Sequence, residues 1–222
     1  MKVFLWGGRS KARIIIEMIS EIYAEETEII GVFDRALTKL PFDTKTKLYS
    51  EKTDLEMLCN QASHFIVCIG GEYGFARFKT AEKLKERGLL PLDLISPNGL
   101  LDKLESYGEG LQVMPGAIAH KFSRIGKQCI LNTNSTVDHE CLIGDGVHIM
   151  GGATIAGRVE IGDFSTVGTN ATILPNIVIG KNVYVGAGAV VTKNIVGNVV
   201  VAGVPAKILY NFEPDIDLSM FE

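Results

Sequence analysis

The chain has 222 residues, of which 22% are charged, and its formal net charge at pH 7 is −4. This length suits one large domain or two modest ones, and the charge balance argues against affinity for nucleic acid or anionic membranes. No apolar run approaches membrane-span length, the N-terminus does not read as a signal peptide, and the four cysteines show no CxxC spacing. We therefore expect a soluble protein of the reducing cytoplasm.

Strands and helices alternate in the first part of the chain. Short apolar runs predict strands at Lys2–Trp6, Glu28–Phe33, His64–Ile69 and Leu89–Ile95. Apolar residues at helical spacing predict helices at Ala12–Tyr23, Asp54–Gln61 and Phe75–Arg87, with Ser10 as the N-cap of the first. This alternation is typical of a parallel sheet, so we expect an α/β, Rossmann-like domain over residues 1–98.

The strand ends of this domain carry candidate nucleotide-binding residues, because ligands of parallel α/β sheets bind at the carboxyl ends of the strands. Those ends offer Gly7, Gly8 and Lys11, then Asp34, then Gly70. Glycine N–H groups at a helix N-terminus and a lysine can bind a pyrophosphate, and an aspartate can bind ribose or base. The full glycine fingerprint is missing, so a tight turn, a solvated lysine and a turn aspartate remain open.

Residues 113–191 repeat with a period of six. Every sixth residue is branched and apolar except one alanine: Val113, Ala119, Ile125, Leu131, Val137, Ile143, Ile149, Ile155, Ile161, Val167, Ile173, Ile179, Val185 and Val191. This period fits a short strand plus a tight turn, three of which close a triangular coil of 18 residues. We expect an all-β solenoid over residues 107–207, after a linker at 100–110 and before a C-terminal tail at 208–222.

His139 and Glu140 form the strongest candidate for catalysis. They follow inward-facing Val137 at a turn, where a solenoid gains nothing structurally from a histidine. An imidazole with a reference pKa near ~6.5 suits a general base, and Glu140 could hold its tautomer. An idle exposed pair is the alternative. A zinc site would need His120 and His148 as well, but His148 lies half a coil from His139, so we expect no metal.

Several segments resemble the hexapeptide-repeat acyltransferases, and within them the NeuD and PglD group of sugar acetyltransferases. The matching segments are Ile130–Thr133, Val137–Cys141 with His148, Leu174–Asn176 and Gly203–Lys207. The resemblance covers essentially the whole chain and implies a left-handed parallel β-helix for the solenoid. It also implies transfer of acetyl from acetyl-CoA to a nucleotide-linked amino sugar or a sialic acid hydroxyl, with active sites formed between subunits.

Site residues follow from this resemblance position by position. His139 takes the general-base position, and Glu140 the position that raises its basicity. His148, Thr169 and Ala187 fall where relatives contact acetyl-CoA. Asn132 belongs to the motif, and we predict a substrate contact for it, with stacking inside a solenoid turn as the alternative.

The N-terminal part departs from the relatives at two places. Lys11 stands where histidine is common in a Gly-x-x-Gly-His-Gly loop, and Arg35 follows Asp34 where many relatives carry two acidic residues. We include Arg35 among the substrate-binding candidates and leave the nucleotide base open. Trp6 could stack on a base, but a core position is the favoured interpretation.

The sequence thus predicts an acetyl-CoA-dependent N-acetyltransferase acting on a nucleotide-activated amino sugar of the 4-amino-4,6-dideoxyhexose type, for surface-glycan biosynthesis. Two alternatives stay open: O-acetylation of a sialic-acid-like sugar, and a non-catalytic trimer that binds sugar nucleotides. We predict a homotrimer from the resemblance and from apolar residues scattered over the prism faces, namely Phe122, Met150, Phe164 and Tyr184.

Overall fold

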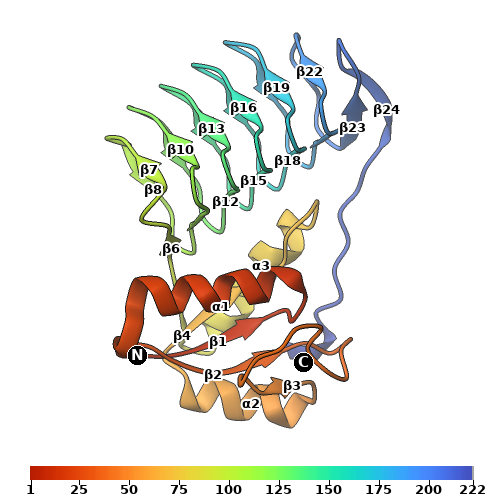
Figure 1. The fold of residues 1–222 in the computed structure, drawn as a ribbon. Coiled ribbons are helices and arrows are strands. Elements are labelled where there is room, and N and C mark those ends of the chain that lie inside the picture. The colour runs from red at the N-terminus through yellow and green to blue at the C-terminus, as the bar shows by residue number, and fades with distance from the viewer. Residues whose placement is uncertain (222) are drawn as a thin grey trace. The chain divides into compact units, whose positions relative to one another are not determined.

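The computed structural model describes residues 1–221, which divide into two compact units (Figure 1). The first unit contains residues 1–69, residues 79–94 and the chain from Asp217 on. The second contains residues 70–78 and 95–216. The chain therefore passes from the first unit to the second twice, and the last described residues belong to the first unit again.

The first unit is built on a five-stranded sheet in the order β3-β2-β1-β4-β5, and all neighbouring strands run parallel. The strands are β1 (Lys2–Trp6), β2 (Glu28–Phe33), β3 (Leu48–Tyr49), β4 (His64–Val67) and β5 (Leu90–Pro91). The helices are α1 (Ser10–Tyr23), α2 (Lys52–Gln61) and α3 (Gly74–Glu86), with the 3-10 turn η1 (Ala24–Glu26). The predicted Rossmann-like parallel sheet is confirmed.

Aromatic and aliphatic side chains from alternating strands and helices fill the core of this unit. Phe4, Phe33 and Phe65 from β1, β2 and β4 are fully buried. Leu55 and Leu58 of α2 and Leu84 of α3 pack in the same cluster. Burial of such large side chains is worth about 1.5–3 kcal/mol each, which explains why short apolar runs become central strands here.

Two local predictions for the first unit are wrong. Helix α1 has Arg9 as its N-cap, without a side-chain cap hydrogen bond, and Ser10 is its first helical residue. The predicted strand Leu89–Ile95 is two short strands, of which only β5 belongs to this sheet. One strand was not predicted: β3 lies within the polar stretch 35–52 and pairs with β2 at the edge of the sheet.

The second unit is a parallel β-helix made mostly of two-residue strands. Its three sheets have the orders β22-β19-β16-β13-β10-β7, β20-β17-β14-β11-β8 and β24-β23-β21-β18-β15-β12-β9-β6. The strands are β6 (Leu94–Ile95), β7 (Leu100–Leu101), β8 (Ser106–Tyr107), β9 (Gln112–Val113), β10 (Ile118–Ala119), β11 (Arg124–Ile125), β12 (Ile130–Leu131), β13 (Thr136–Val137), β14 (Leu142–Ile143), β15 (His148–Ile149), β16 (Thr154–Ile155), β17 (Glu160–Ile161), β18 (Thr166–Val167), β19 (Thr172–Ile173), β20 (Val178–Ile179), β21 (Tyr184–Val185), β22 (Val190–Val191), β23 (Val199–Ala202) and β24 (Lys207–Asn211).

Each coil of the β-helix takes 18 residues. Leu131 pairs with Ile149, and Ile149 pairs in turn with Val167. Every member of the predicted apolar series is at most 4% exposed. Branched side chains are stiff and fit a pleated, fully buried layer, so one such residue per strand suffices to define the interior.

The β-helix begins and ends differently from prediction. The supposed linker at 100–110 contains β7 and β8, which pair with β10 and β11, so a coil is already present ahead of residue 107. The supposed tail starts inside β24, which runs antiparallel to β23. Further on, the chain from Asp217 belongs to the first unit and forms the 3-10 turn η2 (Ser219–Phe221).

Residues 70–78, which include the first turn of α3, pack on the β-helix within the second unit. Arg77 is fully buried there, with Nε donating to Gln128 O and Nη2 to Gly146 O, both at 2.7 Å. Burial lowers the pKa of Arg77 to about 10, which still leaves the guanidinium charged at neutral pH. A Cβ on Gly74 would lie 2.2 Å from Gly146 O, so this approach requires glycine.

The same segment covers Phe164, which we had expected on an open face of the prism. Its ring meets those of Phe75 and Phe78 with centroids 5.2 and 5.4 Å apart. Phe164 is therefore a packing residue within the chain, whereas Phe122 is 63% exposed.

Candidate active site and nucleotide pocket

The structure brings His139 and Glu140 together at the coil corner that follows β13. His139 Nδ1 lies 2.8 Å from Glu140 Oε2, and the histidine side chain is 40% exposed. Because a carboxylate accepts and cannot donate, the proton of a neutral ring sits on Nδ1. Nε2 then keeps its lone pair, which is the state a general base needs.

Backbone hydrogen bonds between coils fix this corner. Glu140 N–H donates to Lys121 O of the coil before, at 3.0 Å, and Arg158 N–H donates to His139 O from the coil after, at 2.9 Å. Asp138 Oδ1 accepts the N–H of His139 at 2.7 Å. Glu140 adopts a left-handed conformation, with φ at 59°, which favours glycine or asparagine over glutamate.

Gly157, which we did not predict as a site residue, makes room for the imidazole. It stands one coil after His139, and a Cβ there would lie 2.5 Å from His139 Nε2. Arg158 beside it places Nη1 3.9 Å from Glu140 Oε2, and its Nε donates to Asn176 Oδ1 at 2.8 Å. Counting 18 residues on from His139 and Glu140 would have found both residues from the sequence.

The structure also brings Asn132 and His148 together, with His148 buried and Asn132 partly exposed. His148 is 3% exposed, with Nε2 3.3 Å from Asn132 Nδ2 and Nδ1 3.0 Å from Gly71 O. A carbonyl only accepts, so Nδ1 carries the proton and Nε2 accepts from the amide. Both ring nitrogens are thus used within the chain, and the predicted contacts of His148 with acetyl-CoA and of Asn132 with substrate remain predictions.

Thr169 and Ala187 are both exposed and occupy one corner of successive coils, as predicted. Gly188 N–H donates to Thr169 O at 2.8 Å, which links the two turns. This corner follows β18 and β21, whereas the corner of His139 follows β13. Along one chain the predicted base and the predicted cofactor edge therefore lie on different corners of the prism.

In the first unit, a cavity of about 540 Å³ lies at the carboxyl ends of the central strands. It is lined by Trp6, Gly7, Phe33, Asp34, Arg35, Ala36, Ile69 and Asp217. The cavity thus brings together three of the predicted nucleotide-binding residues, Gly7, Asp34 and Arg35. Gly70 is counted with the second unit, so it does not join them within this one.

The N–H groups of Gly7 and Gly8 are both bonded within the chain, and the predicted contact of these glycines with a nucleotide remains a prediction. Gly7 N–H donates to Phe33 O and Gly8 N–H to Asp34 Oδ2, both at 2.8 Å. Asp34 Oδ1 accepts Ala36 N–H at 2.9 Å. Gly8 allows close packing, since a Cβ there would lie 2.9 Å from Leu40, whereas Gly7 has a φ of +99° that other residues rarely adopt.

Trp6 packs against two rings at the edge of the core but is only partly buried and also lines the cavity, so the core position favoured from the sequence holds in part. Its ring centroid is 4.8 Å from that of Phe33 and 5.0 Å from that of Phe221, with which it stacks at 12°.

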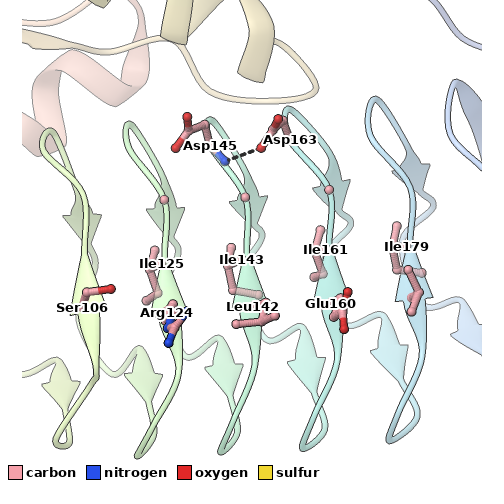
Figure 2. A pocket seen from close by; sticks show the side chains of 14 residues that line it. Ser106, Arg124, Ile125, Leu142, Ile143, Asp145, Glu160, Ile161, Asp163 and Ile179 are labelled. Carbon is pink, nitrogen blue, oxygen red and sulfur yellow. Dashed lines mark hydrogen bonds between the residues drawn. The ribbon is translucent and has the colours of Figure 1, made fainter.

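A second hollow, of about 550 Å³, runs across the sheet of β11, β14, β17 and β20 (Figure 2). None of the predicted site residues lines it. Asp145 and Asp163 at its edge cap backbone groups of the preceding coil: Asp145 Oδ1 accepts Lys127 N–H at 2.7 Å, and Asp163 Oδ1 accepts Asp145 N–H at 2.9 Å. The two carboxylates therefore serve to hydrogen-bond backbone groups between coils of the β-helix.

Within residues 1–221, no group of three or more His, Cys, Asp and Glu side chains is placed to hold a metal ion. His120, the third candidate ligand, instead has Nε2 3.5 Å from Asp102 Oδ2. No helix in the described part of the chain has the length and apolarity to cross a bilayer.

A family model described as bacterial transferase hexapeptide (six repeats) matches residues 140–174 and 158–193. A histidine-to-asparagine variant of perosamine N-acetyltransferase from Caulobacter crescentus, solved with CoA and GDP-perosamine, has a TM-score of 0.85 and 29% identity over 95% of this chain and 98% of that one. The acetyltransferase domain of PglB from Neisseria gonorrhoeae, solved with acetyl coenzyme A, has a TM-score of 0.83 and 27% identity over 94% and 98%. WeeI from Acinetobacter baumannii has a TM-score of 0.81 and 26% identity over 94% and 100%.

These likenesses cover both units and confirm the resemblance seen in the sequence, including the left hand of the β-helix. Residues 140–193 thus carry the hexapeptide repeat of bacterial transferases, and the chain shares its fold with sugar N-acetyltransferases.

Proposed function

We propose that this protein transfers the acetyl group of acetyl-CoA to the amino group of a nucleotide-linked amino sugar of the 4-amino-4,6-dideoxyhexose type, in the biosynthesis of a surface glycan. The observation that carries the proposal is the hydrogen bond of 2.8 Å between His139 Nδ1 and Glu140 Oε2, which leaves Nε2 as a base at a half-exposed corner. Similar structures with CoA and GDP-perosamine support the substrate class.

The reaction is a direct transfer. The sugar amine attacks the thioester carbonyl carbon, and His139 Nε2 takes the proton that the nitrogen loses. Collapse of the tetrahedral intermediate breaks the carbon–sulfur bond, and the imidazolium returns the proton to the departing CoA sulfur. Glu140 stabilises the imidazolium, so its loss costs less than loss of the base. Cys141 is no nucleophile here, because it is fully buried and burial raises its pKa.

Acetyl-CoA binds along the corner that carries Thr169 and Ala187, near His148, and the first unit binds the nucleotide. Three chains form the active protein. Because the predicted base and the predicted cofactor edge lie on different corners of the prism, one chain's His139 serves the cofactor held by a neighbouring chain.

The test is release of CoA by the purified protein from acetyl-CoA with a panel of 4-amino and 4-hydroxy nucleotide sugars. We expect turnover with a 4-amino sugar. His139→Ala should lower kcat by about 10² to 10⁴ while CoA affinity stays. The limb of the pH profile that reports the base should vanish in this variant. Wild-type turnover by His139→Ala would exclude the assigned role, and turnover of 4-hydroxy sugars alone would make the enzyme an O-acetyltransferase.

A further inference from the structure

The cavity at the carboxyl ends of β1, β2 and β4 is completed by a segment from the far end of the chain. Asp217 lines it together with Asp34 and Arg35, and all three belong to the first unit. These are the charged residues among its lining groups, so two carboxylates stand beside one guanidinium.

Arg35 is held by the C-terminal segment through one nitrogen. Its Nη1 lies 3.2 Å from Asp217 Oδ2 and 3.2 Å from Ser219 Oγ. Among residues 1–221, no hydrogen bond is made by its Nε or Nη2, and its side chain is 47% exposed. A guanidinium has five donors in a planar fork that matches a phosphate, so Arg35 can receive an anionic ligand from the cavity.

Asp34 does not compete for this guanidinium. Both of its oxygens accept backbone N–H groups, from Gly8 and Ala36, which hold the carboxylate at the end of β2. The carboxylate that pairs with the Arg35 guanidinium is that of Asp217. Hydrogen bonds from Ser219 and the nearby Arg35 lower the pKa of Asp217, so that it is ionised at neutral pH.

The ion pair between Arg35 and Asp217 is weak and can be replaced by another ligand of Arg35. The residues that follow Asp217 are instead packed firmly against the first unit. Both side chains are about half exposed or more, and such pairs hold weakly in water. Three residues after Asp217, Met220 is 9% exposed in the core, and the Phe221 ring stacks on Trp6. The carboxylate can thus leave Arg35 and return while the segment stays attached.

We propose that Arg35 is the anion-binding group of this cavity, that Asp217 and Ser219 occupy it in the free protein, and that a phosphate of a nucleoside diphosphate displaces them. Asp217 acts as a built-in competitor that lowers the affinity for nucleotides. This inference rests on the nucleotide-binding part of the proposed function.

The test is titration calorimetry of the full chain with GDP and UDP, with the corresponding nucleosides and with inorganic pyrophosphate. Removal of the competing charge in Asp217→Asn should tighten diphosphate binding about two- to five-fold, the range of an exposed ion pair. Arg35→Gln should weaken it roughly tenfold, because charge-assisted hydrogen bonds to phosphate are lost. Nucleoside binding should change in neither variant.

Glu28→Gln is the matched control, since Glu28 pairs with Lys2 at 3.8 Å, outside the residues that line the cavity, and should bind as the wild type does. Thermal unfolding, measured on every variant, reports that the fold is intact. Weaker or unchanged diphosphate binding by Asp217→Asn overturns the inference and leaves the proposed function standing. A wild-type protein that binds CoA but neither diphosphate overturns both this inference and the nucleotide part of the proposed function.

Discussion

At the scale of single residues, the imidazole of His139 is placed by what surrounds it on neighbouring coils. Glu140 accepts the hydrogen bond of His139 Nδ1. Gly157 has no side chain and so leaves room for His139 Nε2. Glu140 occupies a left-handed position at a cost of about 1 kcal/mol or more for a residue with a side chain. Phe122 and Arg158, one coil before and one coil after, share this conformation, so it belongs to the coil turn.

We predict that Gly157→Ala lowers turnover without unfolding the protein. The new Cβ would lie 2.5 Å from Nε2, and the ring of His139, the end of a flexible side chain, would have to move. A misplacement near 1 Å can cost about 10² in rate. The CoA-release assay measures the loss, and thermal unfolding checks the fold.

A double-variant cycle is the control for this prediction. If Gly157→Ala acts only through the imidazole, it should cost nothing further when His139 is already alanine. A loss of the same size in both backgrounds would show that Gly157 acts through another group.

At the scale of elements, the buried guanidinium of Arg77 binds the start of helix α3 to the β-helix. Arg77 donates to the carbonyls of Gln128 and Gly146, which belong to successive coils. Coil corners present carbonyl groups that strand pairing alone does not fully satisfy, and a planar guanidinium can serve two of them at once. The helical spacing of Phe75–Arg87 predicted the helix but not this role.

We predict that Arg77→Met lowers the free energy of unfolding by about 2–4 kcal/mol, because buried carbonyls lose their donors. Arg124→Met is the matched control: Arg124 is exposed and bonded to Glu105, so its replacement should leave stability nearly unchanged. Urea denaturation of both variants measures the difference. Equal stabilities would mean that Arg77 fills space and contributes no hydrogen bonding.

At the scale of the whole molecule, we predict a homotrimer of about 72 kDa, three times the 24.1 kDa of the chain. Light scattering after gel filtration tests the mass, and a monomer at micromolar concentration would refute it. The shared active site can be tested separately by mixing two inactive variants, His139→Ala and Ala187→Trp.

The mixture should recover activity, because some interfaces then combine an intact His139 with an intact Ala187 edge. When equal amounts of the two variants assemble at random, roughly a quarter of the interfaces combine an intact His139 with an intact Ala187 edge. Co-expressed variants that form mixed trimers but remain inactive would place the base and the cofactor edge on one chain.

The sequence by itself determined the repeat, the parallel sheet and the pairing of His139 with Glu140. A period of six fixes which residues face inward, and neighbours in sequence stay neighbours in space. The predicted domain boundary was less accurate. Leu101 and Tyr107 continue the period of six ahead of Val113, and β7 and β8 form there because adjacent coils offer unpaired backbone groups.

Only the tertiary structure decided which distant residues meet. Gly157 lies beside His139 because coils stack, and the buried ring of His148 bonds to Asn132 and to Gly71, which precedes it by 77 residues. Asp217 reaches Arg35 across 182 residues of sequence. No local sequence pattern predicts such contacts, because they depend on where the chain returns after the β-helix is complete. From the sequence alone, the acidic C-terminal segment was therefore interpreted as a tail.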